Sequence, residues 1–383
     1  MQLGIERRMV PHIPWGLIAS ILAVSLLGIW NLASASRPPH NPVWTHQMVN
    51  LLVALAAAGA VCLVDYRFIR RMAVPVYLLN LAALIALKVI GHRAKGAESW
   101  FALGPVRVQP AEFMKIGLIL MLAKFFHDDY RPSDDSYGFT RLWRPVLISL
   151  IPMALVFIAP DLGTTMMLLF TATTVILFAK VKRSVLIALG VAGALVAAVI
   201  WNDYVRDAPE PRRTFVRQLL KHHQSQRIAS WLDPAADLRG SSYHAAQSKI
   251  AVGSGGLAGK GWGHGTQTGL FFLPEQHTDF IFSVWAEEHG FLMCLLLLSL
   301  YAAILLLAIG VAFNSRDRFG AFVAVGVAAM IFWQVFENIG MVSGLLPVTG
   351  ITLPLMSYGG SSLVSVLIGL GLLVNISMRR HIF

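Results

Sequence analysis

The chain reads Phe272-Leu273-Pro274-Glu275-Gln276-His277-Thr278-Asp279-Phe280-Ile281-Phe282 at the point where a long polar loop ends and a long apolar helix begins. The carboxylate of Asp279 therefore falls where water meets lipid, a depth at which a charge is costly unless it is paired or used. One interpretation of Asp279 is a general base that takes a proton from a hydroxyl group. The other is that Thr278 or Asp279 is simply the N-cap of the helix.

Composition predicts an all-α polytopic membrane protein. Of the 383 residues 56% are hydrophobic and 13% are charged, whereas soluble domains carry about 25% charged residues. Apolar residues form blocks of roughly 16 to 25, long enough to cross the hydrocarbon core at about 1.5 Å per residue. We expect about ten transmembrane helices in a single membrane domain covering 1–383, at about 14–35, 44–64, 74–91, 110–126, 145–160, 162–180, 184–201, 279–312, 319–342 and 358–378.

The distribution of basic residues orients the chain. With both termini in the cytoplasm, the inside segments hold sixteen Lys and Arg residues, and the short outside loops hold four, namely Arg37, Arg93, Lys95 and Arg107. One large extracytoplasmic loop, about 202–278, then lies between spans seven and eight. Chemistry on that face has no access to ATP, so a substrate there must carry its own leaving group.

Charge and cysteine content narrow the function classes further. The net charge of +11 is explained by cytoplasmic loops, so no nucleic-acid partner is expected. Cys62 and Cys294 lie inside apolar blocks and are interpreted as small apolar residues. Cys and His show no metal-ligand spacing, so no metal site is predicted in the protein.

Three further ionisable residues lie at or within the predicted spans. Glu112 and Lys115 are three residues apart on one helix face, so they either neutralise each other or mark the inward face of that helix. Asp161 precedes a span as a candidate N-cap, or it pairs with Lys115 across the bundle. Polar residues within spans, Lys88, Glu287, Glu288, Glu337 and Asn338, suit an enzyme and a transporter equally.

The large loop adds basic and glycine-rich segments. Arg213, Arg217 and Lys221 recur every four residues and predict a basic amphipathic helix, which would contact anionic headgroups or hold a pyrophosphate, the first interpretation being favoured. The glycine-rich segment 253–265 fails as a Walker A loop, because Ser254 and Gly261 break the pattern. It is interpreted as a flexible loop whose backbone can approach a ligand closely.

Together these segments resemble the SEDS family (shape, elongation, division and sporulation proteins) over nearly the whole chain. The matching strings are Lys95-Gly96-Ala97, Gln109-Pro110-Ala111-Glu112 with Lys115, Pro160-Asp161-Leu162-Gly163-Thr164, Gln247–Gly256, Gly259-Lys260-Gly261, Gly265-Thr266-Gln267, Leu273-Pro274-Glu275, His277–Phe282, Asn338–Met341, Leu346–Gly350, Leu353-Pro354 and Ser357–Ser361. The form Ser248-Lys249-Ile250-Ala251 resembles the elongation branch of the family rather than its division branch.

The resemblance implies a peptidoglycan glycosyltransferase that polymerises lipid II on the outer face of the bacterial inner membrane during cell elongation and rod-shape maintenance. It implies a class B penicillin-binding protein as crosslinking partner, with other elongation-complex membrane proteins and membrane lipids around it. Asp279 matches the family's essential acidic residue, and Glu112, Lys115 and Asp161 match its other important polar positions. Ser99 and Ala159 depart from the family's usual Arg and Gln, and His223-Gln224 departs from a usual Tyr-Gln pair, which leaves the contacts of those loops open.

Substrate-binding candidates are Arg213, Arg217, Lys221, Arg227, Lys249, Lys260, His277 and Thr278. Arginine and lysine side chains of the large loop, or a divalent cation such as Mg²⁺ or Mn²⁺, would stabilise the leaving pyrophosphate. No cofactor intrinsic to the protein is expected. Two other functions stay open at this point: a flippase or other transporter of the same lipid, and a non-catalytic scaffold for the penicillin-binding protein.

Overall fold

The computed structural model describes residues 7–36, 43–90, 92–94, 97–103, 106–130, 136–202, 227, 231, 241–273 and 275–380. Arg213, Arg217 and Lys221, with the amphipathic helix expected around them, lie outside these residues, as does the departure at His223-Gln224.

The described chain is a helical bundle. Its elements are η1 (Arg7–His12), α1 (Trp15–Ala35), α2 (Val43–Leu63), α3 (Tyr66–Ile90), α4 (Pro110–Asp128), α5 (Phe139–Ile158), α6 (Leu162–Phe178), α7 (Arg183–Trp201), α10 (Ser241–Ser254), α11 (Thr266–Gly269), α12 (Ile281–Phe313), α13 (Arg318–Ser343) and α14 (Gly360–Met378). Seven of these helices are long and apolar enough to cross a membrane: α1, α2, α3, α5, α12, α13 and α14. The helices α6 and α7 are shorter apolar helices, and α4 carries four charged residues. Each predicted span thus coincides with a helix, which confirms the polytopic helical fold.

Several helices are longer than the apolar blocks that predicted them. The helix α3 starts at Tyr66 instead of 74, and α5 starts at Phe139 instead of 145, so Pro75 and Pro145 lie inside helices. Hydropathy marks the part of a helix that lies in hydrocarbon, whereas backbone hydrogen bonding continues into the polar flank. Bounds taken from hydropathy are therefore too narrow at polar ends.

A small antiparallel sheet is the one departure from an all-helical description within the described residues. Strands β1 (His92–Ala94), β2 (Ala97–Leu103) and β3 (Val106–Val108) pair in the order β1-β2-β3, inside the loop 92–109 between α3 and α4. No strand was expected there. The sheet leads directly into α4, where Pro110 occupies the first turn and needs no hydrogen-bond partner for its nitrogen.

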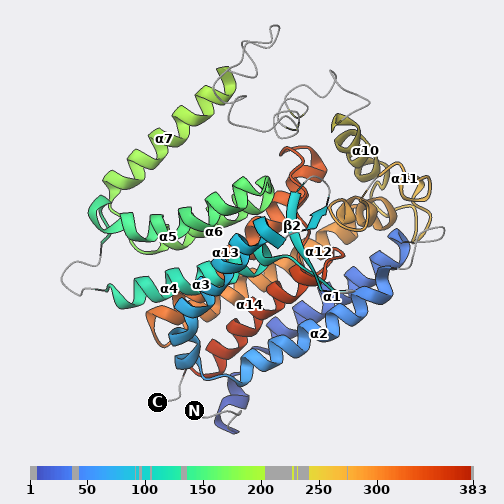
Figure 1. The fold of residues 1–383 in the computed structure, drawn as a ribbon. Helices are drawn as coiled ribbons and strands as arrows, with labels where there is room; N and C mark the ends of the chain where they lie inside the picture. Colours follow the sequence, from blue (N-terminus) through green and yellow to red (C-terminus); the bar gives the residue numbers. More distant parts are fainter. Residues whose placement is uncertain are drawn as a thin grey trace.

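Figure 1 shows the helices side by side, with η1 and the end of α14 at one end of the bundle and α10 and α11 at the other. The helices α13 and α14 are central, since 72% and 89% of their apolar windows are buried. In contrast, α7 projects away from the bundle, and its side chains from Leu186 to Val199 are exposed. An apolar helix exposed on all sides suits contact with lipid.

The span predicted at 279–312 is interrupted. Within α12 the residue Gly290 has φ 72° and ψ −174°, which is not helical, so a half-helix 281–289 precedes the long apolar part 291–313. Only glycine adopts this backbone region readily. All residues of the half-helix are buried, whereas Phe291 and Leu292 directly after the break are exposed. Asp279 therefore precedes a buried half-helix and not the lipid-facing span itself.

Candidate functional site

Asp279 lies in a tight turn that precedes α12. The backbone N–H groups of Thr278, Asp279 and Phe280 all donate to the carbonyl oxygen of Glu275, over 3.1, 3.2 and 3.4 Å. The N-cap of α12 is Phe280, and no side chain caps this helix end. The interpretation of Thr278 or Asp279 as an N-cap is therefore wrong, because the turn places both residues before the cap position.

Three consecutive carbonyl groups of this turn are anchored to one region of the protein. The carbonyl of His277 accepts from the N–H of Tyr358 (2.9 Å), and that of Thr278 accepts from Ser357 Oγ (2.7 Å). The carbonyl of Asp279 accepts from Asn338 Nδ2 (2.9 Å), which also donates to the carbonyl of Ile351 (2.6 Å). The end of α13 and the loop after it thus fix the backbone on which Asp279 is carried.

The segment 349–351 of that loop lies between Asp279 and the start of α6. At Gly350 (φ 81°) a Cβ atom would come 3.3 Å from Asp279 Oδ2. On the other side, a Cβ atom at Gly163 would come 2.8 Å from Ile351 Cδ1 and 3.1 Å from the carbonyl of Thr349. Arg227 Nη1 donates to this same carbonyl over 3.0 Å. Asp279 and the candidate Arg227 are therefore both brought close to one short segment.

Four ionisable side chains from α4, from α13 and from the turn before α6 interact near this segment, and we name Glu112, Lys115, Asp161 and Glu337 the buried charge cluster. Lys115 Nζ lies 2.7 Å from Glu112 Oε2, which also accepts from Ser365 Oγ over 3.3 Å. The predicted pairing of Glu112 with Lys115 is confirmed. Asp161 interacts electrostatically with both of them, and Glu337 with Lys115 and Asp161.

Asp161 confirms its interpretation as an N-cap, whereas its predicted pairing with Lys115 is an electrostatic interaction and not a salt bridge. It is the N-cap of α6, where Oδ1 accepts from the N–H of Thr164 (3.0 Å) and Oδ2 accepts from Thr164 Oγ1 (2.9 Å). Gln109 Nε2, at the N-cap of α4, also donates to Oδ2 over 3.2 Å. Burial raises the pKa of the Asp161 carboxyl, while the hydrogen bonds from Thr164 oppose that rise. Asp161 is therefore both the N-cap of α6 and a member of the buried charge cluster.

The remaining candidates within the described residues lie at different places. The Lys249 side chain covers Gly344, the left-handed C-cap of α13, near Trp231, whose Nε1 donates to the Gly344 carbonyl over 3.3 Å. Lys260 Nζ forms a salt bridge of 2.6 Å with Glu287 Oε1 on the half-helix. His277 and Thr278 belong to the Asp279 turn. Roles of these residues in substrate binding stay predictions.

The glycine-rich segment 253–265 packs on the half-helix, which corrects its interpretation as a flexible ligand-binding loop. The N–H groups of Lys260 and Gly261 donate to the carbonyls of Glu287 and Glu288, and those of Phe291 and Leu292 donate to the carbonyls of Gly256 and Leu257. The segment therefore replaces the helical hydrogen bonds that are lost at Gly290. Its glycines allow this approach: a Cβ atom at Gly255 or Gly259 would come 2.0 or 2.2 Å from a carbonyl oxygen of α12.

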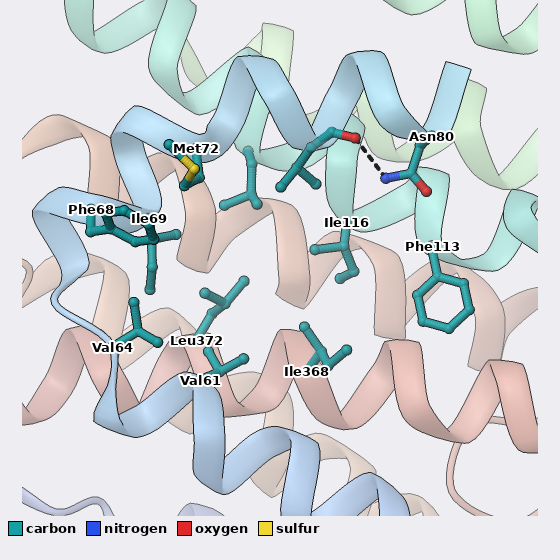
Figure 2. Close-up of a pocket in the computed structure, with 12 residues that line it drawn as sticks. Val61, Val64, Phe68, Ile69, Met72, Asn80, Phe113, Ile116, Ile368 and Leu372 are labelled. Atoms are coloured by element: carbon teal, nitrogen blue, oxygen red, sulfur yellow. Dashed lines mark hydrogen bonds between the residues drawn. The ribbon is translucent and has the colours of Figure 1, made fainter. Parts of the chain in front are cut away.

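Figure 2 shows an apolar cavity of about 330 Å³ between α2, α3, α4 and α14. Its lining residues are Val61, Val64, Phe68, Ile69, Met72, Val76, Asn80, Phe113, Ile116, Leu120, Ile368 and Leu372. The amide of Asn80 donates back to the Val76 carbonyl over 2.8 Å, which satisfies the one polar side chain of this lining. Phe113 and Ile116 line the cavity from α4, the helix that also carries Glu112 and Lys115 of the buried charge cluster.

Among the residues of the site, Asn338, Gly350 and Ser357 were not predicted to hold Asp279. For Asn338 the sequence did carry a signal, since Glu337 and Asn338 are consecutive polar residues within an apolar span. Such residues indicate an inward-facing site but not its partner. Within the described residues, no group of three or more His, Cys, Asp and Glu side chains is placed to hold a metal ion.

Comparison with known proteins adds independent observations. Residues 10–382 match the FtsW/RodA/SpoVE model of cell cycle proteins. Over 308 residues the chain is 40% identical to the peptidoglycan glycosyltransferase MrdB of Escherichia coli (strain K12), covering 79% of this chain and 77% of that protein.

Two solved structures are similar over almost the full length. A chain of a peptidoglycan synthase complex, studied for the coordination of polymerization and crosslinking, matches with a TM-score of 0.80 and 32% identity, covering 97% of this chain and 99% of that one. The crystal structure of the rod shape determining protein RodA of Thermus thermophilus matches with a TM-score of 0.69 and 30% identity, covering 96% and 98%. This similarity to RodA agrees with the predicted resemblance to the elongation branch of the family.

Proposed function

The chain belongs to the FtsW/RodA/SpoVE family of cell cycle proteins, and from that membership we propose how this peptidoglycan glycosyltransferase works, with Asp279 as its general base. Its relative MrdB is a peptidoglycan glycosyltransferase, and its structural relative is a chain of a peptidoglycan synthase complex. The substrate is proposed to be lipid II, a disaccharide-peptide joined through pyrophosphate to a lipid.

One observation carries the assignment of Asp279. Its backbone and the two residues before it are held by hydrogen bonds from Tyr358, Ser357 and Asn338. A general base must be held within hydrogen-bond reach of the proton that it removes, and such fixed placement lowers the barrier. Asp279 is the acidic residue of this anchored turn, 277–279.

In the proposed reaction Asp279 takes the proton of the acceptor sugar's 4-hydroxyl as that oxygen attacks the anomeric carbon of the donor. The new carbon–oxygen bond forms while the bond from the anomeric carbon to undecaprenyl pyrophosphate breaks, and the pyrophosphate oxygen keeps the bonding electron pair. One displacement inverts the anomeric centre, so an α-linked donor gives a β-1,4 link. General-base catalysis of this kind contributes about 10²–10⁴ in rate.

The leaving pyrophosphate needs positive charge. Arg227 lies at Thr349, on the segment that touches Asp279, and is the described arginine best placed for this role. Arg213, Arg217, Lys221, Lys249 and Lys260 remain further candidates. A divalent cation is proposed only as a companion of the substrate phosphates, because the described residues offer it no set of ligands.

The lipid part of the substrate is proposed to lie among the helices. The cavity of Figure 2 is apolar and adjoins α4, so it suits a hydrocarbon chain. The protein crosses the membrane several times, and we propose that this is the bacterial inner membrane, with both termini in the cytoplasm. Figure 1 supports this orientation, because η1 and the end of α14 lie opposite α10 and α11.

The structural relative belongs to a synthase complex that coordinates polymerization and crosslinking. For this chain we propose a class B penicillin-binding protein as the crosslinking partner, together with other elongation-complex membrane proteins. The described residues carry no feature that favours a flippase or a scaffold over an enzyme.

The deciding experiment is polymerisation of purified lipid II by this protein with its penicillin-binding partner, whose crosslinking serine is blocked by a β-lactam. Wild type is expected to make long glycan strands, and Asp279→Asn none, while Asp128→Asn at the exposed cytoplasmic end of α4 stays active. Equal polymer from wild type and Asp279→Asn would remove Asp279 from the mechanism. Absence of polymer with wild type, accompanied by lipid transfer across vesicles, would favour the flippase.

A further inference from the structure

Glu337 is a buried carboxyl group to which the described residues give no hydrogen bond of good geometry. Only 2% of the residue is exposed, and neither carboxyl oxygen has a hydrogen-bond partner within the described part of the chain. The Thr349 hydroxyl lies close to this carboxyl but does not form a hydrogen bond of good geometry with it. An ionised carboxylate in this position would be costly, because nothing replaces the water that burial removes.

The neighbours of Glu337 do not supply the missing positive charge. Lys115 on α4 attracts it, but the Lys115 ammonium is already paired with Glu112 at 2.7 Å. Asp161, at the start of α6, repels it. With every member ionised, the buried charge cluster would hold three carboxylates against one ammonium. Burial of such an excess of negative charge is unfavourable, so one carboxyl group is expected to hold a proton.

Hydrogen bonding identifies which carboxyl group that is. Asp161 accepts three hydrogen bonds, from Thr164 twice and from Gln109, and Glu112 has both a salt bridge and the Ser365 hydroxyl. Donors of this kind stabilise the ionised form. Within the described residues Glu337 has only the nearby Thr349 hydroxyl, which forms no hydrogen bond of good geometry with it. The proton therefore belongs on Glu337.

The position of Glu337 connects its charge to the reaction. The next residue, Asn338, holds the carbonyl of Asp279, and Thr349 is followed by Gly350, where a Cβ atom would come 3.3 Å from Asp279 Oδ2. The other charged groups around this region are Arg227 at the Thr349 carbonyl and, about two turns along α13, Lys249 over Gly344. A negative charge on Glu337 would therefore lie close to the residues that hold Asp279.

We propose that Glu337 is held in its protonated, neutral form and that this neutrality allows the anionic pyrophosphate substrate to bind beside Asp279. The inference rests on the proposed function for the identity of the substrate. Glu337 is a positioning residue in this scheme: it acts through the charge of the cluster and takes no part in bond making or breaking. When Glu337 loses its proton, the added negative charge repels the pyrophosphate, so KM rises while kcat changes little.

The test is the pH dependence of KM for lipid II between about pH 6.5 and 9, measured for the wild-type complex, Glu337→Gln and Asp128→Asn. Wild type and the Asp128→Asn control should show KM rising by up to roughly tenfold per pH unit above the ionisation midpoint, as expected when a single protonated form binds. Glu337→Gln resembles the protonated acid and should keep KM within about twofold at every pH. A folded Glu337→Gln protein with the wild-type slope, or with KM raised tenfold at neutral pH, would overturn the proposal.

A second measurement does not depend on activity. Infrared spectroscopy of the protein with ¹³C-labelled glutamate should show, at neutral pH, the C=O stretch of a protonated glutamic acid, moved by the label, and this band should be lost in Glu337→Gln, which separates it from bands of other buried residues such as Glu288. If wild type and Glu337→Gln show the same bands, Glu337 is ionised and the inference fails, even where the polymerase is active. If instead the wild-type complex makes no polymer, the proposed function fails, and the infrared band still decides whether Glu337 is neutral.

Discussion

Asn338 holds Asp279 in place: its side-chain amide nitrogen lies 2.9 Å from the Asp279 carbonyl oxygen and also bonds the carbonyl of Ile351, over 2.6 Å. One amide group thus joins the turn before α12 to the loop after α13. Because Asn338 is fully buried, no water can substitute for it.

Replacement of Asn338 by alanine should lower kcat. Two buried carbonyl groups lose their donor, which costs about 1–3 kcal/mol of stability, and Asp279 is released from one of its anchors. Small displacements of a catalytic group are expensive, so kcat for lipid II polymerisation is expected to fall roughly 10- to 100-fold with little change in KM. Asn314→Ala is the matched control, because that exposed amide donates within its own helix at the end of α12. Unchanged kcat in a folded Asn338→Ala protein would contradict the anchoring role.

Gly350→Ala should also impair catalysis, for a different reason. The residue has φ 81°, a backbone region that costs a residue with a Cβ atom about 1–2 kcal/mol, and the new methyl group would come 3.3 Å from Asp279 Oδ2. The carboxylate must then shift, so we expect kcat to fall about tenfold or more. Gly253→Ala is the control, because no heavy atom lies within 4 Å of its Cβ position in α10. Equal activities of the two variants would show that Gly350 does not shape the site.

Lys260→Met should destabilise the half-helix 281–289. Glu287 is fully buried and ionised against Lys260, but it keeps donors at Thr266, Gln267 and Thr268, and a quarter of the Lys260 side chain is exposed. We therefore expect the free energy of unfolding to fall by about 1–3 kcal/mol, which is less than for a buried ion pair whose carboxylate has no other donors. The loss should be measurable as a lower Tm in detergent. Lys124→Met removes an exposed pair with Asp128 and should change Tm little. A double variant, Lys260→Met with Glu287→Gln, should recover part of the loss; failure to do so would show that Lys260 acts mainly through packing.

Hydropathy and short-range spacing predicted most of the fold. The ten apolar blocks coincide with helices because each span must satisfy its own backbone hydrogen bonds in lipid. The spacing of Glu112 and Lys115 predicted their salt bridge, since residues three apart share a helix face. Asp279 became a candidate because it is a carboxylate at the start of an apolar block, and the resemblance to a known family then favoured it as the general base; that role stays a prediction.

Contacts between distant segments could not be predicted. The apolar pattern from Ile281 to Phe313 continues through Gly290, and the break exists because the segment 255–261, some thirty residues earlier, supplies the hydrogen bonds that a helix would otherwise make. The glycines of that segment indicated close approach of a backbone, but the partner is the protein's own helix instead of a ligand. In the same way, Asn338 was visible as a polar residue in a span, and only the fold shows that it reaches Asp279.

Ile368→Trp should narrow the apolar cavity of Figure 2 and weaken binding of the substrate's lipid chain. Ile368 on α14 lines this cavity opposite α3 and α4, so an indole ring would occupy space proposed for hydrocarbon. Each buried methylene contributes about 0.8 kcal/mol, so displacement of two of them should raise KM roughly tenfold for lipid II while kcat changes little. A lipid II analogue with a chain too short to reach the cavity should show a smaller change. Leu306→Trp is the control, because Leu306 on α12 is 69% exposed and lines no part of the cavity. If both variants leave KM for the long-chain substrate unchanged, the chain runs elsewhere between the helices.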